Sequence, residues 1–258
     1  MSYTRSLTEV RKEDLALVGG KAAGLGELFR AGLPVPPGFC VTSLAYEAFV
    51  HHNGLERVVR EALALGGLPG LEEAERASRA IRAAMEAAPV PPDVEEAVGQ
   101  ALEALGPGPV SVRSSATAED LPEASFAGQY DTYLNVQGLP EVLRCIKGCW
   151  ASLWSPRAVQ YRHQHGYDHW RVRMAVVVQR LVPAQVSGVM LTVNPISGDR
   201  GQMVISATYG LGEALVSGAV TPDSFTVAKD SLALVSNQVG AKEVMAVPGA
   251  HGGTVTTA

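Results

Sequence analysis

The sequence has few cysteines, few aromatic residues and no long apolar segment. Three cysteines in 258 residues are too few for a disulfide framework, and an odd number leaves one thiol unpaired. We therefore expect reduced thiols in the protein core. Cys145 and Cys149 are four residues apart and would share one face of a helix, but no nearby Cys or His completes a tetrahedral zinc site.

The longest apolar stretches, such as residues 174–178 and 189–193, are far shorter than the roughly 20 residues of a transmembrane helix. The N-terminal segment carries scattered charges and lacks the apolar core of a secretory signal. We therefore expect no membrane span and no membrane partner. A cytoplasmic location follows from these two expectations.

Positive charge is not in excess either. The 21 Lys and Arg residues are outnumbered by 26 Asp and Glu residues, which gives a formal net charge of −5. Such a balance offers no field that attracts a polyanion, so we expect no nucleic-acid partner. What the chain does have is 47% hydrophobic residues and 27 glycines, and its length allows one large domain or two small ones.

Helical periodicity dominates the first part of the chain, where Gly and Pro residues follow the apolar repeats and act as helix stops. After a short strand, we expect helices over residues 20–31, 43–52 and 55–105, the last interrupted at 66–70. A proline-led strand over 35–42 separates the first two.

The pattern changes at Gly106-Pro107-Gly108-Pro109, which breaks helices. Two more helices are expected, over 141–153 and 155–165. Segments rich in β-branched residues otherwise predominate and are typical of strands. The predicted strands are 109–115, 130–136, 172–182, 186–193, 203–208, 224–227 and 232–235.

The first candidate site is Gly19-Gly20-Lys21, followed by Gly24 and Gly26, where a loop enters a helix. Glycines let the backbone approach a bulky anion, while helix-start amides and a lysine ammonium supply positive charge. Lys21 is therefore a candidate phosphate ligand. The spacing does not match the usual P-loop, and an ordinary glycine-rich helix start with a solvated lysine is the alternative.

The second candidate is Val112-Arg113-Ser114-Ser115, a strand expected to carry a guanidinium and two hydroxyls into a polar loop. A planar arginine holds two phosphate oxygens at once, which the point charge of lysine cannot do. Arg113 is therefore a second candidate phosphate ligand. The alternative is a strand-edge arginine paired with an acidic residue of the loop, namely Glu119, Asp120 or Glu123.

Two further segments carry polar groups that fit a nucleotide. Residues 125–132 form a turn of small residues, in which Gly128 would let the backbone pack against a nucleotide, unless this is an ordinary hairpin-like turn. Gln179 is a polar residue among valines in the segment 176–182. Its amide donates and accepts hydrogen bonds, as recognition of an adenine edge requires, or it faces solvent.

The last candidate is Gly210-Leu211-Gly212-Glu213, a flexible glycine-rich link with one carboxylate. Glu213 would orient a lysine or reach Mg²⁺ through water, and the alternative is a plain surface carboxylate. The six histidines are scattered, and none lies in a glycine-rich turn resembling a nucleophile site. We expect them at the surface or in the packing.

Five blocks of sequence, in one order, resemble a single family. They are GGKAAGLGEL (19–28), VPPGFCVT (35–42), VRSSATAEDLPEASFAGQYDTYLNV (112–136), SGVMLTVNPISG (187–198) and YGLGEALVSGAVTPD (209–223). Together they resemble the pyruvate- and ATP-binding domain of phosphoenolpyruvate synthase, of the same family as pyruvate phosphate dikinase and the rifampin phosphotransferases. The resemblance implies an α+β, ATP-grasp-like fold in which two subdomains enclose a nucleotide cleft.

The resemblance also implies roles for individual residues. ATP and Mg²⁺ are the cofactors it implies. The metal ligands stay unknown, because the family's metal-binding carboxylate strand would lie beyond Ala258. The matching positions are Lys21 and Arg113 for the phosphates, Gly128 and Thr132 for the nucleotide, and Gln179 near the base.

The same resemblance predicts the domain organisation. A helix-rich part over 1–108 and a sheet with helices over 109–195 would form the first subdomain, and 196–258 an incomplete second one. The final stretch, HGGTVTTA, resembles an interrupted connection, as in a piece of a longer protein.

In such enzymes ATP phosphorylates a histidine on a separate swivelling domain, which then passes the phosphoryl group to pyruvate, with AMP and phosphate as products. The carrier and acceptor domains are absent from this sequence, so we expect the isolated chain to bind ATP but to be inactive. Residues 194–198 (NPISG) are closer to the rifampin phosphotransferases, which makes an antibiotic kinase the alternative. A rival of another class is a non-catalytic nucleotide sensor or interaction module.

Overall fold

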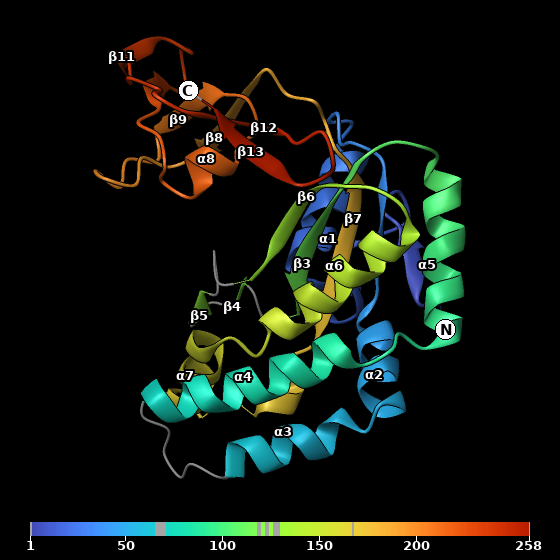
Figure 1. The fold of residues 1–258 in the computed structure, drawn as a ribbon. Helices are drawn as coiled ribbons and strands as arrows, with labels where there is room; N and C mark the ends of the chain where they lie inside the picture. The colour runs from blue at the N-terminus through green and yellow to red at the C-terminus, as the bar shows by residue number, and fades with distance from the viewer. Residues whose placement is uncertain are drawn as a thin grey trace. The chain divides into compact units, whose positions relative to one another are not determined.

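The computed structural model describes residues 2–64, 71–117, 120–121, 124–125, 130–166 and 168–257. The chain divides into two compact units, Met1–Leu181 and Val182–Ala258. Helices and antiparallel sheets build the described part, which confirms the predicted α+β class (Figure 1). Within these residues, no helix combines the length and apolar character needed to cross a membrane.

The helices lie close to their predicted positions, and α2 coincides with the prediction. Pro92 opens α5 at a position where the missing N–H costs nothing. The helices are α1 (Leu15–Arg30), α2 (Ser43–His52), α3 (Leu55–Ala64), α4 (Leu71–Ala87), α5 (Pro92–Leu105), α6 (Leu139–Ser152), α7 (Pro156–Gln164) and α8 (Glu213–Val216), with short 3-10 helices η1 (Lys12–Asp14) and η2 (His169–Arg171).

The strands are also near their predicted positions, with additional pairs at the C-terminal end and around residue 120. Those of the first unit are β1 (Thr4–Ser6), β2 (Gly38–Val41), β3 (Val110–Ala116), β4 (Asp120–Leu121), β5 (Ala124–Ser125), β6 (Thr132–Val136) and β7 (Met174–Arg180). Those of the second are β8 (Val186–Leu191), β9 (Gln202–Tyr209), β10 (Asp223–Ala228), β11 (Leu234–Gln238), β12 (Met245–Pro248) and β13 (Thr254–Thr257).

The central sheet of the first unit has the order β1-β2-β7-β3-β6, and neighbouring strands are antiparallel. Side chains of β7 alternate between two cores, as the strand period of two requires. Val176 and Val178 belong to the large core that includes α6, while Ala175 and Val177 belong to a small core with Val18 of α1. Figure 1 shows α6 in front of the sheet and α1 behind it.

The large core contains buried aromatic residues of the first unit, among them Trp150 and Phe49. Trp150 of α6 is fully buried, and its ring lies 4.8 Å from that of Phe49 of α2. The three cysteines are free and buried, which confirms the prediction of reduced core thiols. Burial raises the pKa of Cys145 to about 11, so this thiol is protonated at neutral pH.

The second unit contains a four-stranded antiparallel sheet of order β11-β10-β9-β8 and the hairpin β12-β13. The hairpin includes most of the final stretch that was predicted to resemble an interrupted connection. Gly252 and Gly253 turn the chain with φ of 96° and 66°, and β-branched Thr254 and Val255 then pair with β12. The two compact units divide after Leu181, and β8 pairs with β9 inside the second unit. The subdomain boundary at 195/196 stays a prediction.

Arg162 of α7 is a buried cation in the first unit. It is 0% exposed, its Nε donates to Nδ1 of His169 at 3.0 Å, and its guanidinium lies 5.1 Å from the ring centre of Trp154. Burial lowers the pKa of His169 to about 4, and the charge of Arg162 adds to this effect. His169 is therefore neutral at pH 7, and its Nδ1 is able to accept the hydrogen bond from Arg162.

The lowered pKa of His169 predicts a loss of stability in mild acid. Between about pH 6.5 and pH 4, His169 binds a proton more readily in the unfolded state than in the folded state. Its contribution to the free energy of unfolding is therefore fully present above pH 6.5 and is lost as the pH falls toward 4. We expect His169→Asn, which keeps an acceptor without titrating, to reduce the stability difference between pH 7 and pH 5 by about 1 kcal/mol, because partial exposure weakens the effect. Urea unfolding of both proteins at the two pH values measures this. An identical pH dependence would contradict the prediction.

Candidate functional site

The glycine-rich start of the predicted helix is a break inside α1. Gly19 has φ 74° and ψ 169°, a backbone conformation that residues other than glycine rarely adopt. It divides α1 into two segments. Ser115 of β3 holds this break together, because its Oγ donates to the carbonyl of Val18 at 2.8 Å and accepts from the amide of Ala22 at 3.1 Å. The N-terminus of the second segment of α1 is therefore hydrogen-bonded to β3. The sequence had predicted a helix that starts at these glycines.

Lys21 follows this break directly. Its Nζ donates to the backbone carbonyl of Ser114, a residue 93 positions further along the chain. The side chain is only partly exposed. The alternative of a fully solvated lysine at an ordinary helix start is therefore wrong.

Arg113 is the neighbour of Ser114 on β3. It pairs with Val177 on one side and with Thr132 on the other, and residues that pair across a sheet point to the same face. Val177 belongs to the small core under α1. Arg113 and Thr132 therefore lie on the α1 side of the sheet, where Thr132 is exposed.

Ser114 and Ser115 were expected to carry their hydroxyls into a polar loop, and this prediction is wrong. Both residues are buried, 1% and 0% exposed. Ser114 Oγ donates to the carbonyl of Asp131 at 3.1 Å, and Ser115 bridges the break in α1. Their hydroxyls satisfy backbone groups that the sheet and the helix leave unpaired.

Gln179 lies two residues along β7 from Val177, on the same α1 side of the sheet. It is 5% exposed, and its Nε2 donates to the carbonyl of Pro36 at 2.9 Å. The alternative of a solvent-facing amide is therefore wrong. The prolines that precede β2 place this carbonyl beside the strand, since Gly38 pairs with Gln179.

The remaining two candidates are not brought to this place by the first unit. Glu213 lies in the second unit, exposed in the first turn of α8, which replaces the predicted flexible link with a short helix. Gly128 lies outside the described residues. The first unit thus brings together Lys21, Arg113, Thr132 and, further along the sheet, Gln179.

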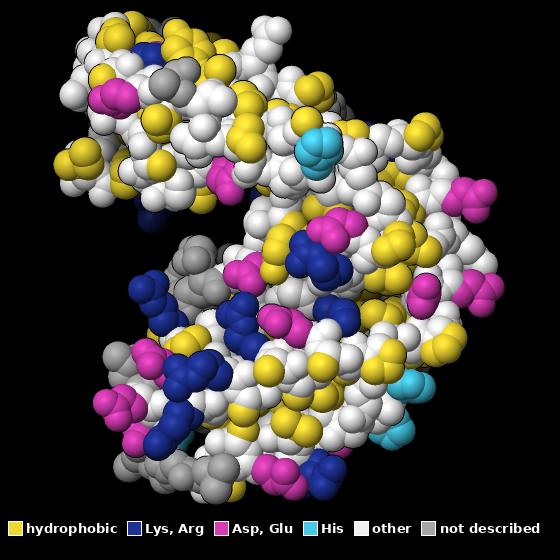
Figure 2. All heavy atoms as spheres, viewed as in Figure 1, with side chains coloured by type: hydrophobic (Ala, Val, Ile, Leu, Met, Phe, Trp, Pro, Cys, Tyr) yellow, Lys and Arg dark blue, Asp and Glu magenta, His cyan; other side chains and the backbone are white. Residues whose placement is uncertain are grey.

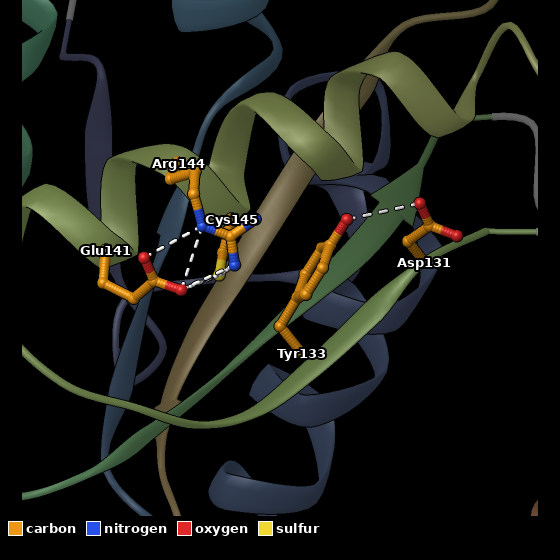
Figure 3. Close-up of polar contacts among 5 residues, drawn as sticks. All are labelled: Asp131, Tyr133, Glu141, Arg144 and Cys145. Atoms are coloured by element: carbon orange, nitrogen blue, oxygen red, sulfur yellow. Dashed lines mark hydrogen bonds and ion pairs between the residues drawn. The ribbon is translucent and has the colours of Figure 1, made fainter. Parts of the chain in front are cut away.

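On the opposite, α6 side of the sheet, a polar network surrounds the start of β6 (Figure 3). Tyr133 Oη donates to Oδ2 of Asp131 at 3.4 Å, and the guanidinium of Arg144 lies 5.6 Å from the centre of the Tyr133 ring. Burial and the nearby Asp131 carboxylate raise the pKa of Tyr133, which keeps its hydroxyl protonated. Arg144 is fixed in turn by two hydrogen bonds from its Nε and one from Nη2 to Glu141.

The surface over the helical part of the first unit carries mixed charge. On the face in Figure 2, Lys and Arg side chains alternate with Asp and Glu side chains. The described residues contain no group of three His, Cys, Asp or Glu that would hold a metal ion. The face drawn in Figure 2 therefore shows no extended patch of positive charge.

The family model of the pyruvate phosphate dikinase AMP/ATP-binding domain matches residues 15–258 of this chain. The chain belongs to this family. The chain is 48% identical over 244 residues to the phosphoenolpyruvate synthase of Aeropyrum pernix, covering 92% of the chain and 30% of that protein. It is 46% identical over 260 residues to the probable phosphoenolpyruvate synthase of Methanocaldococcus jannaschii, covering 98% of the chain and 22% of that protein.

The chain is also similar to a relative with a different name. It is 43% identical over 255 residues to the rifampicin phosphotransferase of Bacillus cereus, covering 98% of the chain and 29% of that protein. The predicted resemblance to both branches of the family is therefore confirmed. The chain spans less than a third of the length of each of these relatives.

Several residues that build the site in this dikinase domain had no sequence signal of their own. Asp131 was noted only as part of a turn, and Arg82 of α4 is one of many charged residues on an exposed helix. Their pairing, at 3.5 Å between Nη2 and Oδ2, joins segments that only the folded chain brings together. Ser115 was predicted to carry a hydroxyl into a polar loop, and its contact with the break at Gly19 was not predicted.

Proposed function

We propose that this dikinase domain binds ATP and that Lys21 and Arg113 hold its phosphates. The observation that carries the proposal is the reach of Lys21 from the break in α1 to the carbonyl next to Arg113. Two cations from distant parts of the chain thus meet at the same strand. A mobile ammonium and a planar guanidinium are the groups that proteins use most often for a triphosphate.

The geometry around the two cations supports a phosphate ligand. The second segment of α1 begins at the break at Gly19, and a helix start favours negative charge. Thr132, the cross-strand partner of Arg113, is exposed and offers a hydroxyl on the same side. We assign Lys21 and Arg113 to the phosphates and Thr132 to the nucleotide.

The other predicted contacts complete the proposed site. We assign Gln179 to the adenine end, since it lies on the α1 side of the sheet and its amide nitrogen carries two hydrogens, one of which meets Pro36. Gly128 and Glu213 stay proposals as nucleotide contacts. Mg²⁺ would be held mainly by the phosphate oxygens, as is usual for this ion, and no step of the proposal runs through a protein-bound metal.

The proposed role of the domain is to bind and orient ATP for transfer to a histidine on a separate carrier domain. The net reaction of the whole protein would convert ATP, water and an acceptor to AMP, phosphate and the phosphorylated acceptor. Lys21 and Arg113 would offset the charge of the phosphates and align them, which is the main task of a protein in phosphoryl transfer. Pyruvate is the proposed acceptor, because two of the three relatives described above are named phosphoenolpyruvate synthases.

The similarity to rifampicin phosphotransferase supports a second candidate, in which the acceptor is a rifamycin-type antibiotic. A non-catalytic nucleotide sensor is the candidate of another class. An assay of the whole protein that contains this domain distinguishes the three candidate functions. AMP formation from ATP is measured with pyruvate and with rifampicin as acceptor. Dependence on pyruvate supports the synthase, dependence on rifampicin supports the antibiotic kinase, and ATP binding without AMP formation supports the sensor.

The proposal predicts that the chain binds ATP at one saturable site. Isothermal titration with ATP and excess Mg²⁺ measures this, and we expect AMP to bind about tenfold or more weakly, because it lacks the β- and γ-phosphates that the two cations would hold. Equal affinity for ATP and AMP would contradict a site built around the phosphates. The absence of any saturable binding would contradict the proposed function as a whole.

A further inference from the structure

Asp131 lies where β6 begins, next to the proposed nucleotide contact Thr132. Its backbone carbonyl accepts hydrogen bonds from both the amide and the hydroxyl of Ser114, at 3.3 and 3.1 Å. The thiol of Cys149 lies 3.6 Å from the same carbonyl. The position of Ser114 is therefore tied to that of Asp131.

Ser114 passes this constraint on to the proposed phosphate site. Its own carbonyl accepts the hydrogen bond from Lys21 Nζ. The backbone of Ser114 thus joins Asp131 on one side to the lysine ammonium on the other. A shift of the Asp131 carbonyl would move the atom that orients Lys21.

The Asp131 side chain is held on the α6 side of the sheet, away from the proposed phosphates. Its Oδ2 accepts from Tyr133 Oη at 3.4 Å (Figure 3). The same oxygen lies 3.5 Å from Nη2 of Arg82. Two groups from different elements, α4 and β6, therefore converge on one carboxylate oxygen.

Tyr133 is itself contacted by two groups of α6. Arg144 covers its ring, and α6 approaches its hydroxyl so closely that a Cβ at Gly148 would lie 2.2 Å from Oη. The close approach of α6 restricts movement of the tyrosine ring on that side. Arg82, the other group of the anchor, has a side chain that is 33% exposed.

We propose that Asp131 is a positioning residue for ATP binding, anchored by Arg82 and Tyr133, and that it acts through Ser114 on Lys21. The inference rests on the proposed function. It adds that Arg82 of α4 contributes to ATP affinity. Because the Arg82–Asp131 pair is about one-third exposed on both sides, it contributes little to stability. Its loss is expected to change ligand affinity more than folding.

The test is a double-mutant cycle between Arg82 and Lys21 in the full chain. We expect Arg82→Gln to raise the ATP dissociation constant about 2- to 5-fold, because a partly exposed ion pair has no more free energy than this to pass on to the site. In a Lys21→Met background the same substitution should have no further effect, because the group it acts through is gone. Arg82→Lys should restore part of the affinity. Arg79→Gln, one turn earlier on α4 and paired with Glu75, is the matched control and should leave affinity unchanged.

A second measurement tests, in the absence of ATP, whether Arg82 restrains the backbone at Asp131 and Ser114. The Ser114 amide donates to the Asp131 carbonyl, so its hydrogen exchange should be faster in Arg82→Gln than in wild type and unchanged in Arg79→Gln. Unchanged exchange in Arg82→Gln would overturn the inference even if the wild-type chain binds ATP. An equal loss of affinity with and without Lys21 would overturn the route through Lys21. A wild-type chain that does not bind ATP would instead overturn the proposed function.

Discussion

Replacing Gly19 with alanine is expected to destabilise the first unit by about 3 kcal/mol or more. Gly19 combines φ 74° with ψ 169°, a region that is costly for any residue with a Cβ. An added Cβ would also lie 2.1 Å from the carbonyl oxygen of Ser115, far inside van der Waals contact. Either the second segment of α1 or β3 must move, and both carry proposed phosphate ligands. Urea unfolding measures the loss.

Gly24 provides the matched control for this prediction. It lies in the same helix, is exposed, and a Cβ there would meet nothing within 4 Å. Gly24→Ala should therefore stabilise the unit by up to about 1 kcal/mol, because alanine is the better helix former. Equal effects of the two substitutions would show that the conformation at Gly19 does not matter.

The second large effect is expected for the two proposed phosphate ligands. Lys21→Ala or Arg113→Ala should each weaken ATP binding by about 1 to 3 kcal/mol, the range for losing a charge-assisted hydrogen bond. Titration calorimetry measures the affinity, and thermal unfolding verifies that each variant is folded. Lys12→Ala, an exposed lysine of η1, is the control and should bind ATP as wild type does. Wild-type affinity in both site variants would remove the assignment.

Local patterns were sufficient for most of the helices. The α2 helix could be predicted to the residue because apolar positions recur along Ser43–His52 and Asn53-Gly54, a pair typical of turns, follows. The hairpin β12-β13 was not predicted, because its strands are only four residues long and the isolated pattern of Thr254–Thr257 gives little signal. Its pairing depends on a partner strand, which the pattern of β13 alone does not reveal.

The candidate site shows the same division between local and long-range information. A lysine after two glycines and an arginine in a strand predict phosphate ligands from their own chemistry, and the fold places them at one strand. The burial of Gln179 could not be predicted, since it depends on the proline-led segment before β2. Arg82 and Asp131 could not be predicted either, because only the packing of α4 near β6 gives each of them a partner.

The break at Gly19 also limits how the sequence can change over time. The atoms nearest to a Cβ at this position include the main-chain carbonyl of Ser115, which every amino acid possesses. Shortening the side chain at 115 would therefore leave the obstacle in place, and no single compensating exchange there would rescue a larger residue at 19. Helix α1 and strand β3 contact each other here through their peptide backbones. A larger residue at position 19 would therefore require both the helix and the strand to change their backbone positions.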